Sequence, residues 1–264
     1  MGHDARTGKE RMTMGRYFYD LHVHSCLSPC GDDDMTPANI AGMAVINGLQ
    51  IVALTDHNTT ANCPAFYAQA KKQGLIPVAG MELTTAEDVH VVCLFPTLEA
   101  AMAFGELVET RRIRIRNKTE IFGNQYVMDE NDQVVREEED LLINATTISI
   151  EEAFELVKPY DGVCYPAHID RSSNGMVAVL GAFPTKPAFT AYELNDPTSV
   201  PIYSSMFPHI KEMARIIDSD AHNLWSLSEA VYALELDDEP YSSDRVRQSL
   251  FRYLRGEMTQ DQKG

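Results

Sequence analysis

The chain has 264 residues, of which 44% are hydrophobic, so it can bury one large core and we expect a single domain of barrel size. The formal net charge of −17 argues against long nucleic acids as partners, because phosphate backbones are bound mainly by Lys and Arg. No apolar run approaches the roughly 18 to 20 residues of a membrane span, and the N-terminal segment lacks the apolar centre of a signal peptide. The five scattered cysteines do not resemble a disulfide framework, so we expect a cytoplasmic protein with no membrane partner, and composition leaves the oligomeric state open.

Strand-like and helix-like runs alternate along most of the chain. We expect residues 1–16 to be a disordered tail and residues 17–264 to form the domain. Apolar runs typical of strands cover residues 17–23, 50–55, 75–83, 89–95, 162–166, 191–195, 215–219 and 231–236.

The helices between these runs have marked boundaries. Thr36 can cap a helix that has Pro37 at its first position. Ser149 and Glu152 have the spacing of a capping box. Residues 243–254 form an amphipathic pattern that predicts a C-terminal helix.

The order of these elements predicts an α/β fold. Repeated strand-then-helix units indicate a mostly parallel sheet, and seven or eight units in about 250 residues favour closure into a TIM-like barrel. An open, doubly wound sheet is the alternative. The alternation breaks over residues 98–148, where a long helix over 98–121 and a hairpin over 126–135 predict an insertion. Such an insertion either shapes the mouth of the barrel or decorates its periphery.

The insertion contains a strongly basic run, residues 111–118, with the sequence Arg-Arg-Ile-Arg-Ile-Arg-Asn-Lys. We interpret it as a solvated helix face. A patch that faces a phosphate group is the alternative.

Histidines and carboxylates stand at the ends of the strand-like runs. His22 and His24 are two residues apart, so a strand points both side chains to the same side, and Asp220 and His222 repeat this spacing. Such groups at the ends of buried strands are costly unless they are paired or bound to metal. Imidazole and carboxylate together suit zinc, manganese or iron. We therefore predict a centre of two or three divalent ions, with the candidate ligands His22, His24, His57, Glu82, His90, His168, Asp220 and His222.

These motifs resemble those of the PHP (polymerase and histidinol phosphatase) superfamily of metal-dependent phosphoesterases. The resemblance is carried by Asp20-Leu21-His22-Val23-His24-Ser25, Thr55-Asp56-His57-Asn58, Gly80-Met81-Glu82 with His90, Pro166-Ala167-His168 and Ser219-Asp220-Ala221-His222. It implies a distorted (β/α)7 barrel that holds two or three ions, usually manganese, zinc or iron. It also implies three sub-sites around a bridging Glu82, formed by His22, His24 and Asp220, by His90 and His168, and by His57 and His222.

The chain departs from the family pattern shortly after the first histidine pair. The family normally has a further His or Asp there, whereas this chain has Ser28-Pro29-Cys30-Gly31-Asp32-Asp33-Asp34. We choose Asp32 as the ligand, because a carboxylate matches the other donors better than a thiol, and Cys30 is the alternative. We expect Asp56, beside His57, to orient the imidazole and not to bind an ion.

Phosphoester hydrolysis is the reaction that such a centre predicts, because adjacent divalent ions activate water and stabilise an in-line displacement at phosphorus. Glu82, His168 and Asp220 are expected to act through the ions. Arg171 is expected to bind the phosphoryl group, and its alternative role is a surface ion pair with Asp170. From the acidic charge we expect a small phosphomonoester substrate, such as a nucleotide or metabolite phosphate.

Three other functions are weighed against this one. An exonuclease or polymerase-associated role, which is also known for the superfamily, is disfavoured by the acidic balance and by the absence of other domains. Amidohydrolases use a similar barrel and a histidine-rich site, but a bridging Glu82 in place of a carboxylated lysine disfavours that class. A non-catalytic, metal-binding regulatory domain is disfavoured by the nearly complete ligand set. Turnover of p-nitrophenyl phosphate, compared with amides and lactones, separates the two classes of hydrolase.

Overall fold

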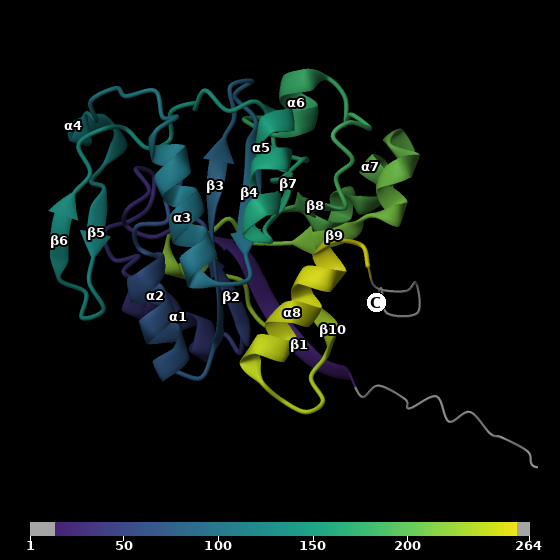
Figure 1. The fold of residues 1–264 in the computed structure, drawn as a ribbon, viewed down its shortest axis with the longest axis horizontal. Helices are drawn as coiled ribbons and strands as arrows, with labels where there is room; N and C mark the ends of the chain where they lie inside the picture. Colours follow the sequence, from purple (N-terminus) through teal and green to yellow (C-terminus); the bar gives the residue numbers. More distant parts are fainter. Residues whose placement is uncertain (1–13, 258–264) are drawn as a thin grey trace, which may run out of the picture.

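The computed structural model describes residues 14–257, in which strands and helices alternate (Figure 1). The strands are β1 (Met14–Val23), β2 (Ile51–Leu54), β3 (Ile76–Thr84), β4 (His90–Phe95), β5 (Tyr126–Met128), β6 (Val134–Glu137), β7 (Val163–Pro166), β8 (Ala191–Leu194), β9 (Ala214–Ile217) and β10 (Ala233–Asp237). The helices are α1 (Pro37–Ile46), α2 (Cys63–Lys72), α3 (Leu98–Glu109), α4 (Thr119–Phe122), α5 (Ile150–Leu156), α6 (Met176–Leu180), α7 (Val200–Met206) and α8 (Ser243–Leu254). Each apolar run that was expected to form a strand does so.

The strands curl into a distorted barrel. One hydrogen-bonded sheet has the order β10-β1-β2-β3-β4-β7, and β8 and β9 form a separate parallel pair. The N–H of Ile169, after β7, donates to the carbonyl of Glu193 in β8 at 3.0 Å. On the other side Val23 of β1 bridges Ala221, just beyond β9. These contacts join β1, β2, β3, β4, β7, β8 and β9 around the barrel, which confirms the expected TIM-like (β/α)7 class.

Strand β4 differs from the mostly parallel sheet that the sequence predicted, because it runs antiparallel to both of its neighbours, β3 and β7. Gly80 of β3 permits the close pairing, since a Cβ there would lie 2.3 Å from the carbonyl oxygen of Cys93. The reversal brings His90, the first residue of β4, beside Thr84 at the end of β3. It therefore delivers an imidazole to the edge at which β2, β3 and β7 end.

The helices pack as their sequence patterns predict. Apolar residues of α1, α2, α3 and α5 cover one face of the strands, and those of α8 join the apolar cluster on the other face. The Thr36 hydroxyl accepts a hydrogen bond from the N–H of Asn39 and caps α1. The capping box of Ser149 and Glu152 is complete at the start of α5.

The first half of the insertion differs from the prediction. Helix α3 ends at Glu109, not near residue 121. Residues 111–118 do not form one continuous helix. The backbone of Arg112 forms an isolated antiparallel β-bridge with Thr146, and that of Arg116 forms one with Asp140. The alternation of arginine with β-branched isoleucine in this run has a period of two, which favours extended backbone over a helix.

The arginines of the basic run are paired with carboxylates, so neither a solvated helix face nor a phosphate patch describes it. The ion pairs join Arg111 to Glu152 (3.2 Å), Arg112 to Glu109 (2.7 Å), Arg114 to Glu109 (2.6 Å) and Asp140 (2.9 Å), and Arg116 to Glu139 (2.6 Å). The charges of these arginines are therefore neutralised by Glu109, Glu152, Glu139 and Asp140.

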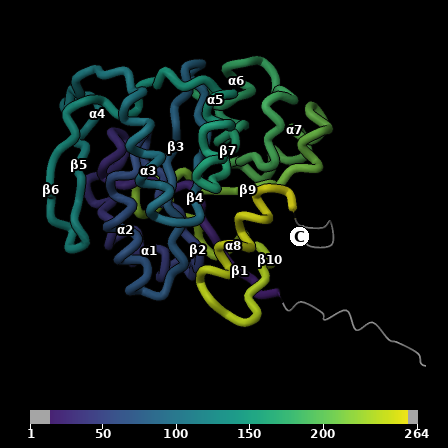
Figure 2. Tube along the Cα trace, viewed as in Figure 1, coloured from purple at the N-terminus to yellow at the C-terminus, as the bar shows by residue number. Residues whose placement is uncertain are grey.

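The predicted hairpin is present as β5 and β6. Its backbone is held by Asn62, whose amide nitrogen donates to the carbonyl of Tyr126 at 3.0 Å and whose amide oxygen accepts from the N–H of Met128 at 2.8 Å. Figure 2 shows the hairpin at the margin of the molecule, on the side away from α7.

The N-terminal prediction is partly wrong. Residues 14–16, expected to be disordered, pair with β10 as the first part of β1. Residues 1–13 of the expected tail lie outside the described residues, so that part stays a prediction. Within residues 14–257, no helix combines the length and apolar character needed to cross a bilayer.

Candidate metal centre

One end of the barrel collects the predicted ligands of the strand ends. The elements that carry them are β1 (His22, followed by His24), the residues after β2 (His57), β3 (Glu82), the start of β4 (His90), and the residues after β7 (His168) and β9 (Asp220 and His222). All of these side chains except that of His222 are buried. Residues more than 190 positions apart in sequence thus form one polar cluster.

Glu82 is the centre of this cluster. Its two carboxylate oxygens lie close to a ring nitrogen of each of five histidines: His90 (2.6 Å), His168 (2.9 Å), His57 (3.0 Å), His24 (3.3 Å) and His22 (3.5 Å). A single buried carboxylate surrounded in this way suits a ligand that bridges two ions.

The donors fit a bound divalent ion. Two buried ring nitrogens of the cluster, Nε2 of His90 and Nδ1 of His168, have no hydrogen-bond partner. Buried polar atoms without partners are costly, so two of them in one cluster indicate that they bind a further group. Imidazole nitrogen and carboxylate oxygen are donors that manganese, zinc and iron accept.

The geometry divides the donors into three groups, in each of which the ligand atoms lie within 4.8 Å of one another. The groups are His22 with His24, Glu82 and Asp220; His57 with Glu82 and His90; and His24 with His57 and His222. The first group contains the complete set that the resemblance implied for one ion. The second contains His57 where His168 was expected, although His168 contacts Glu82 directly.

Hydrogen bonds outside the cluster orient three of the imidazoles. Their Nδ1 atoms pair with the Glu193 carboxylate (His22, 2.8 Å), the Ser28 hydroxyl (His24, 2.9 Å) and the carbonyl oxygen of Asp220 (His222, 2.8 Å). Carboxylate and carbonyl oxygens only accept, so Nδ1 carries the proton in His22 and His222 and the lone pair of Nε2 is left for an ion.

Asp56 orients a different histidine from the one expected. Its carboxylate accepts hydrogen bonds from the hydroxyls of Ser25 (2.7 Å) and Ser28 (2.8 Å). Because the Ser28 hydroxyl donates to Asp56, it accepts from Nδ1 of His24. Asp56 therefore acts on His24 through Ser28, whereas the sequence placed it beside His57.

Glu193 is a residue of the site that the sequence analysis missed. It lies in β8, is fully buried and holds Nδ1 of His22. The available signal was a carboxylate inside an otherwise apolar strand, where an unpaired charge is costly. A carboxylate behind a metal-binding histidine fixes the ring and makes it a better donor.

Replacing Glu193 by glutamine should weaken metal binding by roughly ten- to a hundredfold, because the amide keeps the size of the side chain but removes its charge. Calorimetric titration of the chelator-stripped protein with Mn²⁺ measures this change. The exposed Glu235 offers the matched control, and its replacement by glutamine should leave the affinity unchanged. Equal affinities of the wild type and the Glu193 variant would refute the role of this residue.

Arg171 is paired with Asp220, not with Asp170. Its Nη1 lies 2.5 Å from Oδ2 of Asp220, and 43% of its side chain is exposed. The Asp170 carboxylate instead accepts hydrogen bonds from the backbone N–H groups of Asn195 and Asp196. Arg171 thus pairs with a candidate metal ligand, and both side chains line one cavity.

The structure favours Cys30 over Asp32 at the position where the chain departs from the family pattern. Neither residue belongs to the three ligand groups, but Cys30 lines the cavity at the ligand cluster and the exposed Asp32 does not. The backbone N–H of Asp32 donates to the carbonyl of His222 at 2.9 Å. By contrast, Sγ of Cys30 lies 3.3 Å from Nε2 of His57. A turn in which Gly31 N–H donates to the Ser28 carbonyl turns the thiol inwards and the carboxylate outwards.

The ligand cluster forms the floor of a cavity of about 210 Å³. Its lining residues are Cys30, His57, Glu82, His90, Ile143, His168, Arg171, Ser173, Asn174, Asp220 and His222. Ile143 comes from the return segment of the insertion. That segment is held by Asn58, whose side-chain amide donates to the carbonyls of Leu142 (2.7 Å) and Asn144 (2.8 Å). The insertion therefore shapes the site, the first of the two alternatives considered for it.

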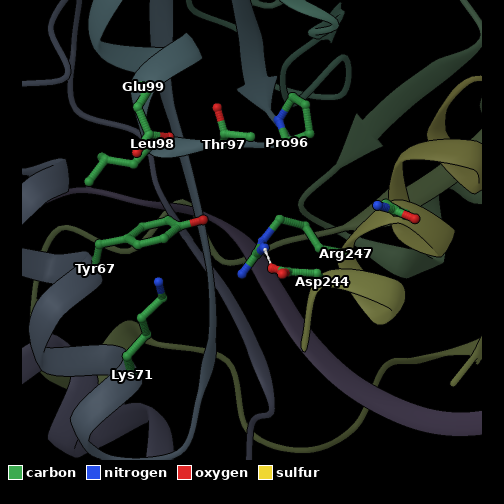
Figure 3. A pocket seen from close by; sticks show the side chains of 9 residues that line it. Tyr67, Lys71, Pro96, Thr97, Leu98, Glu99, Asp244 and Arg247 are labelled. Atoms are coloured by element: carbon green, nitrogen blue, oxygen red, sulfur yellow. Dashed lines mark hydrogen bonds and ion pairs between the residues drawn. The ribbon is translucent and has the colours of Figure 1, made fainter. Parts of the chain in front are cut away.

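A second cavity, of about 350 Å³, contains none of the ligands. Its lining includes Tyr67, Lys71 and Arg247, and the Arg247 guanidinium lies between the Tyr67 ring and Asp244 (Figure 3). Arg247 pairs with Asp244 at 2.7 Å and donates to the carbonyl of Pro77, at the start of β3, at 3.1 Å. It thereby joins α8 to the sheet, and we place the functional site at the smaller cavity because the clustered ligands line it.

The imidazoles of the cluster have divergent proton affinities. Burial alone would lower the pKa of His24, but hydrogen bonds to Asp220 and Glu82 raise it to about 9. Burial and the neighbouring His24 lower the pKa of His57 to about 3 and that of His222 to about 4. Burial opposes the ionised form of Glu82, yet the surrounding imidazoles hold its pKa well below the ordinary value. Without metal, the cluster therefore contains an ionised carboxylate, a protonated His24 and two imidazoles, His57 and His222, that stay neutral, and a bound ion would displace the proton of His24.

Comparisons with known proteins agree with this arrangement. A sequence model of the PHP domain matches residues 20–179, more than half of the chain. A 5'-3' exoribonuclease of Haemophilus influenzae is 31% identical over 114 residues, which cover 40% of each protein. The lesion-specific endonuclease PfuEndoQ from Pyrococcus furiosus has a TM-score of 0.61 at 18% identity, over 92% of this chain and 56% of that one. Endonuclease Q in complex with a 27-mer duplex substrate, which carries an abasic lesion at the active site, has a TM-score of 0.58 at 18% identity over 89% and 56% of the two chains.

The predicted exclusion of nucleic acids is wrong. The exoribonuclease and endonuclease Q act on nucleic acids, as their names and the duplex complex state. Net charge failed as a guide because it averages over the whole surface, whereas metal ions and a local arginine can contact phosphate at the site itself. This chain spans about two fifths of the exoribonuclease and just over half of the endonuclease Q chain. The barrel, the ligand cluster and the match over residues 20–179 together show that the chain belongs to the PHP domain family.

Proposed function

We propose that this protein is a metal-dependent phosphoesterase that hydrolyses the phosphodiester bond at the end of a single-stranded nucleic acid. The observation that carries this proposal is the cluster around Glu82, at the floor of a small cavity that Arg171 lines. The nucleic-acid-acting relatives support the choice of substrate class.

The protein's part in the reaction is to place charges. Bound divalent ions supply an activated water and stabilise the charge that develops at phosphorus. Glu82, Asp220 and the histidines, including His168, hold the ions in place. Asp220 directs Oδ1 towards His24 at 3.0 Å and Oδ2 towards Arg171 at 2.5 Å. It therefore fixes the phosphate-binding guanidinium relative to the ions, and Arg171 neutralises a phosphoryl oxygen.

The size of the cavity favours the end of a strand over the interior of a duplex. A volume of about 210 Å³ holds a phosphoryl group with part of a nucleoside, which the end of a strand supplies directly and a duplex supplies only after a nucleotide leaves the stack. The basic run 111–118 is paired with carboxylates, so phosphate contacts concentrate at Arg171 and the ions. One or two such contacts predict a shallow salt dependence of binding, with a log–log slope of about −0.7 per phosphate.

The proposal is tested with Mn²⁺-loaded protein and a single-stranded oligoribonucleotide that carries a 5'-phosphate and a fluorophore at the 3' end. Stepwise shortening with release of mononucleotides is the expected result, and a duplex of the same sequence should resist. Release of inorganic phosphate without shortening would make the protein a phosphatase. Turnover confined to amides or lactones would favour the amidohydrolase alternative.

Replacing Arg171 by alanine should lower kcat/KM for the oligonucleotide by about ten- to a hundredfold, since a hydrogen bond to a charged group contributes about 1.5–3 kcal/mol. Replacement of Arg116, which is 73% exposed and paired with Glu139 in the insertion, is the matched control and should leave the rate unchanged. Equal rates of the Arg171 variant and the wild type would remove this residue from the mechanism.

A further inference from the structure

Cys30 is the exposed member of the five cysteines, all of which lie within the described residues. The others, Cys26, Cys63, Cys93 and Cys164, are buried. Its thiol lies 3.3 Å from Nε2 of His57, and both residues line the cavity at the metal centre. A soft donor therefore stands among ligands that are otherwise nitrogen and oxygen.

The distance between the two atoms matches that of two ligands on one ion. With zinc–sulfur and zinc–nitrogen bonds of about 2.3 and 2.0–2.1 Å at a tetrahedral angle, sulfur and nitrogen stand roughly 3.5 Å apart. The observed separation is 3.3 Å. His57 also belongs to the group that it forms with His24 and His222, whose ligand atoms lie within 4.8 Å of one another.

The backbone of the loop supports the same assignment. The N–H of Asp32 donates to the carbonyl of His222 at 2.9 Å, which ties the loop that carries Cys30 to the segment that carries the third imidazole. Gly31 allows the tight turn, because a Cβ there would lie 2.5 Å from the carbonyl oxygen of Ser25. The loop is therefore fixed directly after the thiol.

We propose that the Cys30 thiolate binds one ion together with His57 and His222, an inference that rests on the metal centre of the proposed function. Binding of the ion displaces the thiol proton to solvent and forms a metal–sulfur bond. Two imidazoles and one thiolate, with a fourth position open to water, select zinc or iron(II) over manganese. The other two groups keep the nitrogen and oxygen donors that manganese accepts.

Cobalt(II) substitution tests the metal–sulfur bond directly, because thiolate ligation gives an intense charge-transfer absorption in the near ultraviolet that nitrogen and oxygen ligands do not give. Chelator-stripped wild-type protein titrated with Co²⁺ should show this band, and Cys30→Ser should lose it. Asp32→Asn is the control and should retain it. Cys30→Asp should restore the number of ions bound, measured by elemental analysis, without restoring the band.

Alkylation gives a second readout that does not depend on hydrolysis. Iodoacetamide should modify Cys30 rapidly in the stripped protein. The Cys30→Ser variant gives the number of Zn²⁺ equivalents that bind without the thiol. One further equivalent of Zn²⁺ added to the wild type should slow the modification of Cys30 at least tenfold. A wild-type protein that binds its full complement of Co²⁺ without a thiolate band, or that alkylates equally fast with and without Zn²⁺, would overturn the proposal. A thiolate band in a protein with no nuclease activity would uphold it and refute the proposed function.

Discussion

Replacement of Glu82 by glutamine should abolish hydrolysis and leave the fold intact. The carboxylate contacts five imidazoles and belongs to two of the three ligand groups, so its loss disturbs both ions that share it. Removing a group that only orients a ligand costs roughly ten- to a hundredfold in activity or affinity, and loss of the shared ligand itself should exceed that range. Replacement of His22 by alanine should have a similar effect through the first group.

The measurement uses protein stripped with a chelator and reconstituted with Mn²⁺, and it follows both oligonucleotide hydrolysis and bound metal. Circular dichroism checks that the barrel persists. The exposed Glu106 of α3 is the matched control, and its replacement by glutamine should change neither readout. Full activity of the reconstituted Glu82 variant would defeat the assignment of the site.

The metal-free protein should be most stable near pH 6.5 and lose stability on both sides. The pKa of His24 is raised to about 9 from 6.5, so its contribution is fully present below pH 6.5 and is lost as the pH rises through 9. That shift alone corresponds to about 3 kcal/mol. The pKa values of His57 and His222 are lowered to about 3 and 4 in the folded protein. As the pH drops below 6.5, these two imidazoles take up protons in the unfolded chain before they do so in the folded protein. The free energy of unfolding therefore falls.

Metal should remove the alkaline decline, because a bound ion replaces the proton as the positive charge beside Asp220 and Glu82. Denaturant titrations of the stripped and Mn²⁺-loaded protein between pH 6.5 and 9 measure this difference. The stripped protein should lose stability over this range and the loaded protein should not. Parallel curves would show that the imidazoles do not exchange protons for metal.

The sequence was sufficient for the barrel and for most of the candidate site because both depend on local patterns. Short apolar runs separated by capped helices predict the strands, and polar residues at their ends are costly to bury without a partner. His57 and His168 could therefore be identified without knowledge of the contacts between them. The separation of such residues along the chain is irrelevant once the strand ends converge.

Other features depend on contacts that no local pattern encodes. The reversal of β4 depends on pairing with β3, where Gly80 allows close approach. Glu193 was missed because it lies within β8 and not beyond a strand end, and its local sequence does not identify His22 as its partner. The choice between Asp32 and Cys30 depends on a turn that directs one side chain inwards and the other outwards. Net charge is a property of the whole surface, and it therefore gave a wrong prediction about nucleic acids, whose binding depends on the charges at the site itself.

Ile143 lies in the insertion, and this position bears on how the protein can change in evolution. The candidate metal ligands come from the barrel and its strand-end loops, whereas this aliphatic side chain of the cavity wall comes from the insertion. Changes in length or sequence within residues 110–148 could therefore alter substrate preference while the ions and their chemistry stay untouched. Exchange of this segment with that of a relative should therefore change the cavity wall and leave the candidate ligands in place.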